Sequence, residues 1–98
     1  MKYDIVIKPL AESDIRDAAI WYEQQRAGLG VRFMEAVEEK FKVIEEHPRL
    51  FEVKYKGIHQ VFLNRFPFAI YYMEENDRIF VLAVSHTSRD PKIWKSRK

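Results

Sequence analysis

Three basic side chains lie at or near the ends of expected β-strands, where they could do acid–base chemistry. Arg65 precedes a Phe-Pro-Phe corner at 66–68, His86 ends the last apolar run, and Arg89 follows it. A histidine beside arginines can transfer a proton and stabilise a phosphate, which is the chemistry of metal-free RNA cleavage. In the structural alternative, Arg65 caps carbonyl groups at the corner and His86 is a satisfied strand-end residue. Residue types alone favour the structural alternative.

Strand pairing offers a way to bring these groups together. If the strand that begins at Phe68 pairs antiparallel with the strand that ends at His86, the two residues lie near each other. We therefore expect Arg65, His86 and Arg89 to share one edge of a sheet.

Other catalytic or metal-binding motifs are missing from the sequence. There are no cysteines, and the three histidines at 47, 59 and 86 have no metal-ligand spacing. There is no Ser-His-Asp arrangement and no glycine-rich phosphate loop. We therefore expect no metal and no cofactor.

Two adjacent aromatic residues, Trp21 and Tyr22, fall within an expected helix. Neighbouring positions on a helix point about 100° apart, so only one of the two rings can join Ala18 and Phe33 in the core. The other ring is then exposed, either as part of a partner-binding patch or at the rim of the core.

Changes in hydrophobic periodicity predict the elements that position these residues. The expected elements are a strand at 3–8, helices at 10–26 and 31–46, strands at 51–56, 58–65, 68–73 and 78–86, and a helical turn from Asp90. Gly28, Leu29 and Gly30 are interpreted as the turn between the helices. The order β-α-α-β-β-β-β predicts an α+β fold, with a helical hairpin packed on one face of a mostly antiparallel sheet and a short basic C-terminal helical tail.

Length and charge limit the choice of function. The 98 residues fit one domain spanning 1–98. The chain carries 17 Lys and Arg against 15 Asp and Glu, but residues 88–98 hold five of the cations and one acid. A near-neutral body argues against general wrapping by nucleic acid. A solvated, frayed tail is the simpler expectation for residues 88–98, and contact with a phosphate or an acidic partner is the alternative.

The sequence also lacks membrane and export signals. No apolar stretch approaches the ~20 residues of a membrane span, and the first residues lack the apolar core of a signal peptide. We therefore expect a cytoplasmic protein with no membrane partner.

Three segments carry recognisable patterns in a fixed order. They are residues 14–51, with Trp-Tyr-Glu, Gly-Leu-Gly and a closing His-Pro-Arg-Leu-Phe; residues 65–72, Arg-Phe-Pro-Phe-Ala-Ile-Tyr-Tyr; and residues 79–94, Ile-Phe-Val-Leu-Ala-Val-Ser-His followed by Arg-Asp-Pro and a Trp. Together they cover nearly the whole chain. Their order and spacing resemble the RelE/ParE superfamily of toxin–antitoxin toxins, also called plasmid-stabilisation proteins.

The resemblance implies a growth-inhibiting toxin that forms a hetero-oligomer with a cognate antitoxin encoded beside it. In this family the C-terminal segment of the antitoxin folds over the toxin, which makes Trp21 and Tyr22 expected antitoxin contacts. The expected target-binding residues are Arg65, His86, Arg89 and Trp94.

The family divides by target, and three positions decide the branch that this chain resembles. Ribosome-dependent ribonucleases carry an arginine, a second basic residue and a tail tyrosine where this chain has Ala69, Thr87 and Trp94. The chain therefore looks more like the ParE branch, whose known members bind DNA gyrase. Two alternatives stay open. One is a metal-independent endoribonuclease acting on ribosome-bound messenger through Arg65, His86 and Arg89, and the other is a degenerate toxin that serves only as a binding module.

Overall fold

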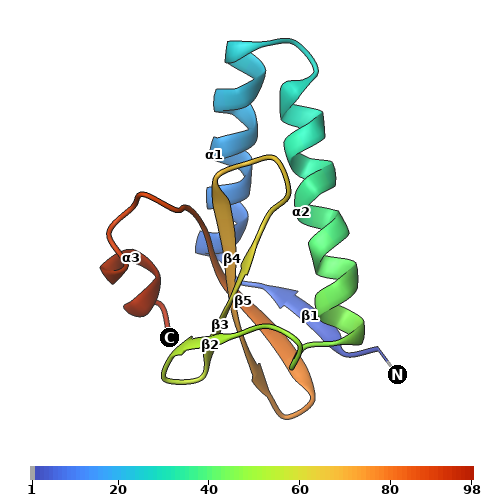
Figure 1. Cartoon of the computed structure of the whole chain (residues 1–98), viewed down its shortest axis with the longest axis vertical. Coiled ribbons are helices and arrows are strands. Elements are labelled where there is room, and N and C mark those ends of the chain that lie inside the picture. Colours follow the sequence, from blue (N-terminus) through green and yellow to red (C-terminus); the bar gives the residue numbers. More distant parts are fainter. Residues whose placement is uncertain (1) are drawn as a thin grey trace.

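Two helices stand side by side on one face of a five-stranded sheet in the computed structural model, which describes residues 2–98 (Figure 1). The elements are β1 (Asp4–Ile7), α1 (Pro9–Gln25), α2 (Leu29–Glu46), β2 (Val53–Tyr55), β3 (Ile58–Phe62), β4 (Phe68–Glu75), β5 (Arg78–His86) and α3 (Lys92–Lys95). The strand order is β1-β5-β4-β3-β2, with β1 parallel to β5 and the other neighbours antiparallel. The α+β fold and its order of elements are therefore confirmed.

The turn between the helices differs from the expectation at Gly30. Gly28 has a left-handed backbone (φ 87°), but α2 already begins at Leu29, so Gly30 is helical and buried. A Cβ atom at Gly30 would lie 2.6 Å from the carbonyl oxygen of Ala19 on α1. The Glu23 carboxylate accepts hydrogen bonds from the N–H groups of Gly28 and Gly30, at 3.0 Å each. The prediction of Gly30 as a turn residue was wrong. Gly30 lies within α2, where the absence of a side chain lets α2 pack closely against α1.

The main core fills the space between the helical hairpin and the sheet. Along α2, Phe33, Val37 and Ile44 are buried, which confirms the apolar stripe read from the sequence. On the other side of this core lie side chains of β3, β4 and β5, among them Val61, Ile70, Tyr72, Ile79, Val81 and Val84. The helices and the sheet therefore bury one shared apolar layer.

A second, smaller core covers the opposite face of the sheet, away from the helical hairpin in Figure 1. The Trp94 side chain of α3 is 5% exposed, and its ring stacks on Tyr71 at 4.3 Å between centroids. Leu82 and Ala83 of β5 belong to the same cluster. The expectation of a frayed tail was wrong, because burial of the Trp94 ring holds the segment on the sheet.

A β-bulge interrupts β5 where it passes α1. Tyr71 pairs with Ala83, but Tyr72 pairs with Val81, so Leu82 is an extra residue in β5. A bulge leaves backbone groups outside the ladder, and side chains must then satisfy them. Here the guanidinium of Arg97 donates to the carbonyl oxygen of Leu82 at 3.2 Å.

The strand expected at 58–65 ends early, at Phe62. Leu63 donates its N–H to the carbonyl oxygen of Phe68 at 2.9 Å, which closes the chain into a corner. Arg65 within this corner has a left-handed backbone (φ 69°), which no strand residue adopts. At the other end of the sheet, Asn76 and Asp77 form the β4–β5 turn with φ values of 52° and 63°. Such paired positive φ angles match the twist of a two-residue hairpin.

Candidate functional site

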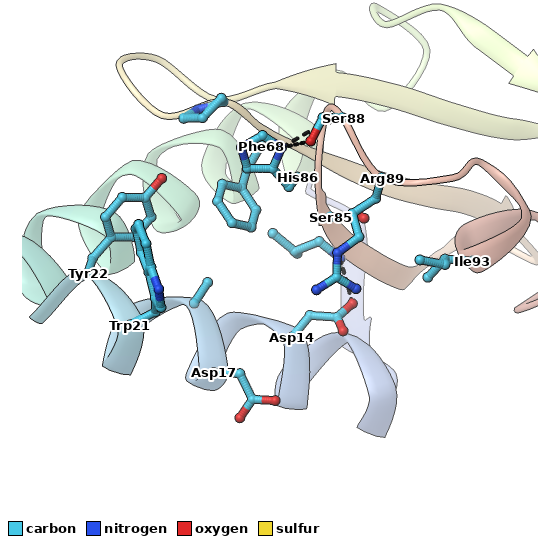
Figure 2. Close-up of a pocket in the computed structure, with 13 residues that line it drawn as sticks. Asp14, Asp17, Trp21, Tyr22, Phe68, Ser85, His86, Ser88, Arg89 and Ile93 are labelled. Carbon is cyan, nitrogen blue, oxygen red and sulfur yellow. Dashed lines mark hydrogen bonds between the residues drawn. The ribbon is translucent and has the colours of Figure 1, made fainter. Parts of the chain in front are cut away.

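A cavity of about 690 Å³ lies between α1 and the ends of β4 and β5 (Figure 2). Its walls come from three parts of the chain: α1, the Pro67-Phe68 corner, and the segment from the end of β5 to α3. The lining side chains include Asp14, Asp17, Trp21, Tyr22, Phe68, Ser85, His86, Ser88, Arg89 and Ile93. The cavity therefore combines aromatic surface with groups of both charges.

His86 lies opposite Phe68 across the β4–β5 pair, which confirms the pairing expected from the sequence. The two rings meet edge to face, 5.3 Å apart. The backbone N–H of Ser88 donates to Nδ1 of His86 at 3.0 Å, and the Ser88 hydroxyl oxygen lies 2.7 Å from the same nitrogen. A nitrogen that accepts an N–H bond carries no proton, so the proton of the neutral imidazole is on Nε2.

Arg89 places its positive charge in the same cavity as His86. Its backbone N–H donates to the carbonyl oxygen of His86 at 3.0 Å, which closes a tight turn after β5. Figure 2 shows the guanidinium directed toward Asp14 on the α1 wall. His86 and Arg89 thus both line this cavity.

Arg65 lies outside this cavity. It lines a neighbouring cavity of about 660 Å³, together with Arg32, Glu35 and Glu39 of α2. Tyr22 and Pro67 line both cavities and therefore stand between them. The structure brings His86 and Arg89 together but puts Arg65 on the other side of this divide.

Trp21 and Tyr22 take the two orientations that their helical spacing requires. The Tyr22 ring stacks on Phe33 at 5.4 Å and meets Phe66 edge to face at 4.9 Å. Its partial burial raises the pKa of the Tyr22 hydroxyl. Trp21 is 55% exposed and touches Tyr22 edge to face at 5.1 Å. Tyr22 therefore serves the core and the cavity wall, while Trp21 presents most of its ring to solvent.

Trp94, an expected target contact, lies in the second core rather than on the surface. Its ring is stacked on Tyr71 and stands 6.4 Å from the ring of Tyr55. The role predicted for Trp94 stays a prediction, and direct contact through the indole would require α3 to leave the sheet.

Nothing in the spacing of residues along the chain indicates that Asp14 and Arg97 act together. Asp14 was one of several charged residues off the apolar stripe of α1, and Arg97 one of five cations near the end of the sequence. In the structure two nitrogens of the Arg97 guanidinium contact the two carboxylate oxygens of Asp14, at 2.5 and 3.3 Å. Asp14 also accepts the N–H of Val84 at 3.0 Å. The pair thus ties α1, β5 and the residues after α3 to one another at the cavity.

No group of three His, Cys, Asp or Glu side chains among residues 2–98 lies close enough to hold a metal ion. Over the same residues, no helix is long and apolar enough to cross a membrane. The polar groups that line the larger cavity are the His86 imidazole, the Arg89 guanidinium, the carboxylates of Asp14 and Asp17, and hydroxyls, and Asp14 is already paired with Arg97. Such a set can bind an anionic or hydrogen-bonding group beside an aromatic surface.

The fold and the cavity define a small α+β protein with a helical hairpin over one sheet face and an aromatic-walled cavity beside it. The family described as the ParE toxin of the type II toxin–antitoxin system parDE matches residues 5–91. The chain belongs to this family, and its resemblance to the RelE/ParE superfamily, closer to the ParE branch, is confirmed.

A solved structure supports the same fold. A chain described as the chromosomal ParDE toxin–antitoxin system from P. aeruginosa superposes with a TM-score of 0.66, over 87% of this chain and 96% of that chain. The two sequences are 13% identical, so the likeness is one of fold. No curated protein matches the sequence.

Proposed function

We propose that this chain inhibits growth by binding DNA gyrase in the cytoplasm, and that a cognate antitoxin neutralises it. Membership of the ParE toxin family supports the role of toxin in a type II pair. The arrangement of the cationic side chains supports binding over catalysis.

The observation that carries the proposal is the separation of Arg65 from His86 and Arg89. Metal-free cleavage of RNA needs proton-transfer groups and charge stabilisers gathered around one phosphate, each within hydrogen-bond reach. Only two of the three candidate residues line the larger cavity. The two positions where ribonuclease relatives carry cations hold a fully buried alanine, Ala69, and an exposed threonine, Thr87.

The exposed Trp21 and the adjoining cavity form the binding site for a segment of the antitoxin in this proposal. An indole that is 55% exposed next to a hollow can be covered by an apolar side chain, and such aromatic anchors often dominate binding energy. Arg89 in the same cavity offers a partner for a carboxylate on that segment. Tyr22, which lines the cavity wall, completes the expected antitoxin surface.

One specific observation favours a second candidate function, the metal-independent endoribonuclease. His86 and Arg89 line the same cavity, so an imidazole capable of proton transfer and a cation are both available to a phosphate bound there. A gyrase inhibitor would stop DNA supercoiling, whereas an endoribonuclease would stop translation by cleaving messenger.

Expression of this chain alone in a bacterial host, with and without the reading frame beside its gene, tests the proposal. We expect viable counts to collapse and the neighbouring frame to restore them. Plasmid DNA from the inhibited cells should lose negative supercoiling while messenger near the ribosomal A site stays intact. Cleaved messenger with normal supercoiling would establish the ribonuclease, and normal growth with folded protein would indicate a degenerate toxin.

A further inference from the structure

Three lysines from two segments far apart in sequence meet beside the edge strand β2, and a fourth precedes one of them by three positions on α3. Lys56 is in the turn between β2 and β3, and Lys92, Lys95 and Lys98 belong to α3 and the residues after it. Nζ of Lys95 and Nζ of Lys56 lie 4.8 and 5.3 Å from the centre of the Tyr55 ring. Nζ of Lys98 donates to the carbonyl oxygen of Lys56. These four residues are named the lysine cluster below.

The charge of the lysine cluster is not neutralised within the part of the chain that the structure describes. All four side chains are exposed, and the ion pairs among residues 2–98 involve other cations, namely Arg49, Lys54 and Arg97. The nearby Asp90 carboxylate accepts the backbone N–H of Lys92 at 2.9 Å, so it caps α3. The four lysines carry +4 and the neighbouring Asp90 carries −1, so about +3 of charge is gathered in this region of a chain whose net charge is +2.

The lysine cluster lies outside both cavities, so its ligand would be bound through charge and not enclosed in a pocket. Neither cavity described above is lined by a lysine of the cluster. A tight complex with an acidic peptide depends on apolar anchors seated in hollows, whereas phosphate contacts need only well-placed cations. Lysine is a point charge on a flexible stem, which suits successive backbone phosphates and reads no base sequence.

We propose that the lysine cluster binds the phosphate backbone of duplex DNA without sequence preference. The choice of DNA over RNA rests on the gyrase target proposed above, since gyrase holds duplex DNA. The lysine cluster and the cavity of His86 share no residue. The toxin can therefore contact a protein through one surface and the DNA of the same assembly through the other.

Fluorescence anisotropy with a labelled duplex of mixed sequence tests the inference on the isolated protein. We expect the wild type to bind with a Kd of about 10⁻⁵ M near 50 mM salt, and at least tenfold more weakly near 200 mM. The triple variant Lys56→Gln, Lys92→Gln, Lys95→Gln should bind roughly tenfold more weakly. The slope of log K against log salt should be shallower by about 2.7, because each of the three lost phosphate contacts removes about 0.9.

A matched control removes the same number of charges elsewhere. The variant Lys2→Gln, Lys40→Gln, Lys42→Gln alters lysines outside the cluster and should change the Kd less than threefold, with the salt slope unchanged. Equal weakening by both triple variants would show attraction by net charge alone and overturn the inference. Absence of DNA binding by the wild type near 50 mM salt, or tighter binding to an RNA duplex or an acidic peptide, would overturn it too.

Two further controls separate loss of DNA binding from unfolding of the variant and from failure of the gyrase proposal. If circular dichroism shows that the cluster variant is unfolded, the single substitution Lys92→Gln replaces it, and the salt slope should fall by about 0.9. Because the assay contains no gyrase, failure to bind DNA rejects this inference alone. Unchanged supercoiling in the presence of toxin rejects the gyrase proposal alone.

Discussion

Asp14 of α1 and Arg97, 83 positions later in the chain, form a two-point ion pair that also satisfies the bulge in β5. Arg97 donates to the carbonyl oxygen of Leu82, and Asp14 accepts the N–H of Val84. The side chains of Arg97 and Asp14 are only 15% and 23% exposed, so water screens the pair weakly. The ion pair thus connects α1, which forms one cavity wall, to the bulge in β5 and to the segment after α3.

Removing the guanidinium should destabilise the protein. Arg97→Met leaves the Asp14 carboxylate and the Leu82 carbonyl oxygen without their charged partner, and we expect a loss of about 2 kcal/mol in the free energy of unfolding. Urea denaturation measures the loss. Lys92→Met, an exposed change on the neighbouring α3, should cost less than about 0.5 kcal/mol. Equal stability of the two variants would mean that the ion pair contributes nothing net.

The buried hydroxyl of Tyr72 should contribute to stability and to its pH dependence. It donates to the carbonyl oxygen of Pro48 at 2.6 Å, so Tyr72→Phe should cost about 1–2 kcal/mol near neutral pH. Burial, with a smaller contribution from Glu74, raises the pKa of Tyr72 above its ordinary value. Below pH ~10 both states keep the proton; above it the unfolded chain loses the proton while the folded protein keeps it.

Stability of the wild type should therefore fall as pH rises above ~10, by up to about 1.4 kcal/mol per pH unit from this group. Denaturation of the wild type and Tyr72→Phe at pH values from about 8 to 11 isolates the effect, because the variant lacks this ionisation and keeps all others. Parallel curves for the two proteins would rule out the contribution assigned to Tyr72.

Trp21 should contribute more to antitoxin binding than to folding. We expect Trp21→Ala to weaken the complex with the cognate antitoxin at least tenfold, since an exposed indole beside a cavity fits the description of an interface anchor. Its cost to folding should stay near 1 kcal/mol, from the lost edge-to-face contact with Tyr22. Titration calorimetry measures the affinity.

Ile20→Ala is the matched control for that prediction. Ile20 is 52% exposed and adjacent to Trp21 on α1, but it does not line the cavity. The affinity of the Ile20→Ala variant for the antitoxin should differ from that of the wild type by less than threefold. A similar loss in both variants would place the antitoxin over the whole outer side of α1 instead of over the cavity.

His86→Gln and Arg65→Met test for catalysis in the toxin. If the protein acts by binding gyrase, neither variant should change the state of cellular messenger, because the wild type does not cleave it. A general acid–base residue contributes about 10²–10⁴ to a rate, so a true ribonuclease would lose most of its cleavage with His86→Gln. Messenger cleavage by the wild type that disappears in a folded His86→Gln variant would contradict the binding proposal.

The periodicity of apolar residues along the chain predicted most helices and strands and two of the residues that line the larger cavity. It predicted the helical hairpin and the apolar stripe of α2, because these depend on which side of one element faces the core. The placement of Phe68 opposite His86 followed from antiparallel pairing of two strands joined by a short turn. Periodicity misjudged Gly30, whose role depends on the approach of Ala19 on the neighbouring helix. The expected pairing of Phe68 with His86 was also extended to Arg65, but the left-handed corner before Phe68 puts Arg65 in the neighbouring cavity.

The sequence by itself therefore determined the class of fold, the order of its elements and the family pattern, since these are written in spacing along the chain. Only the tertiary structure decided which distant side chains share a site. It joined Asp14 to Arg97, buried Trp94 on Tyr71 and gathered Lys56 with the lysines of α3. Periodicity reports burial on one face of one element, whereas these contacts depend on the bulge, the corner and the docking of α3, which are set by packing among several elements at once.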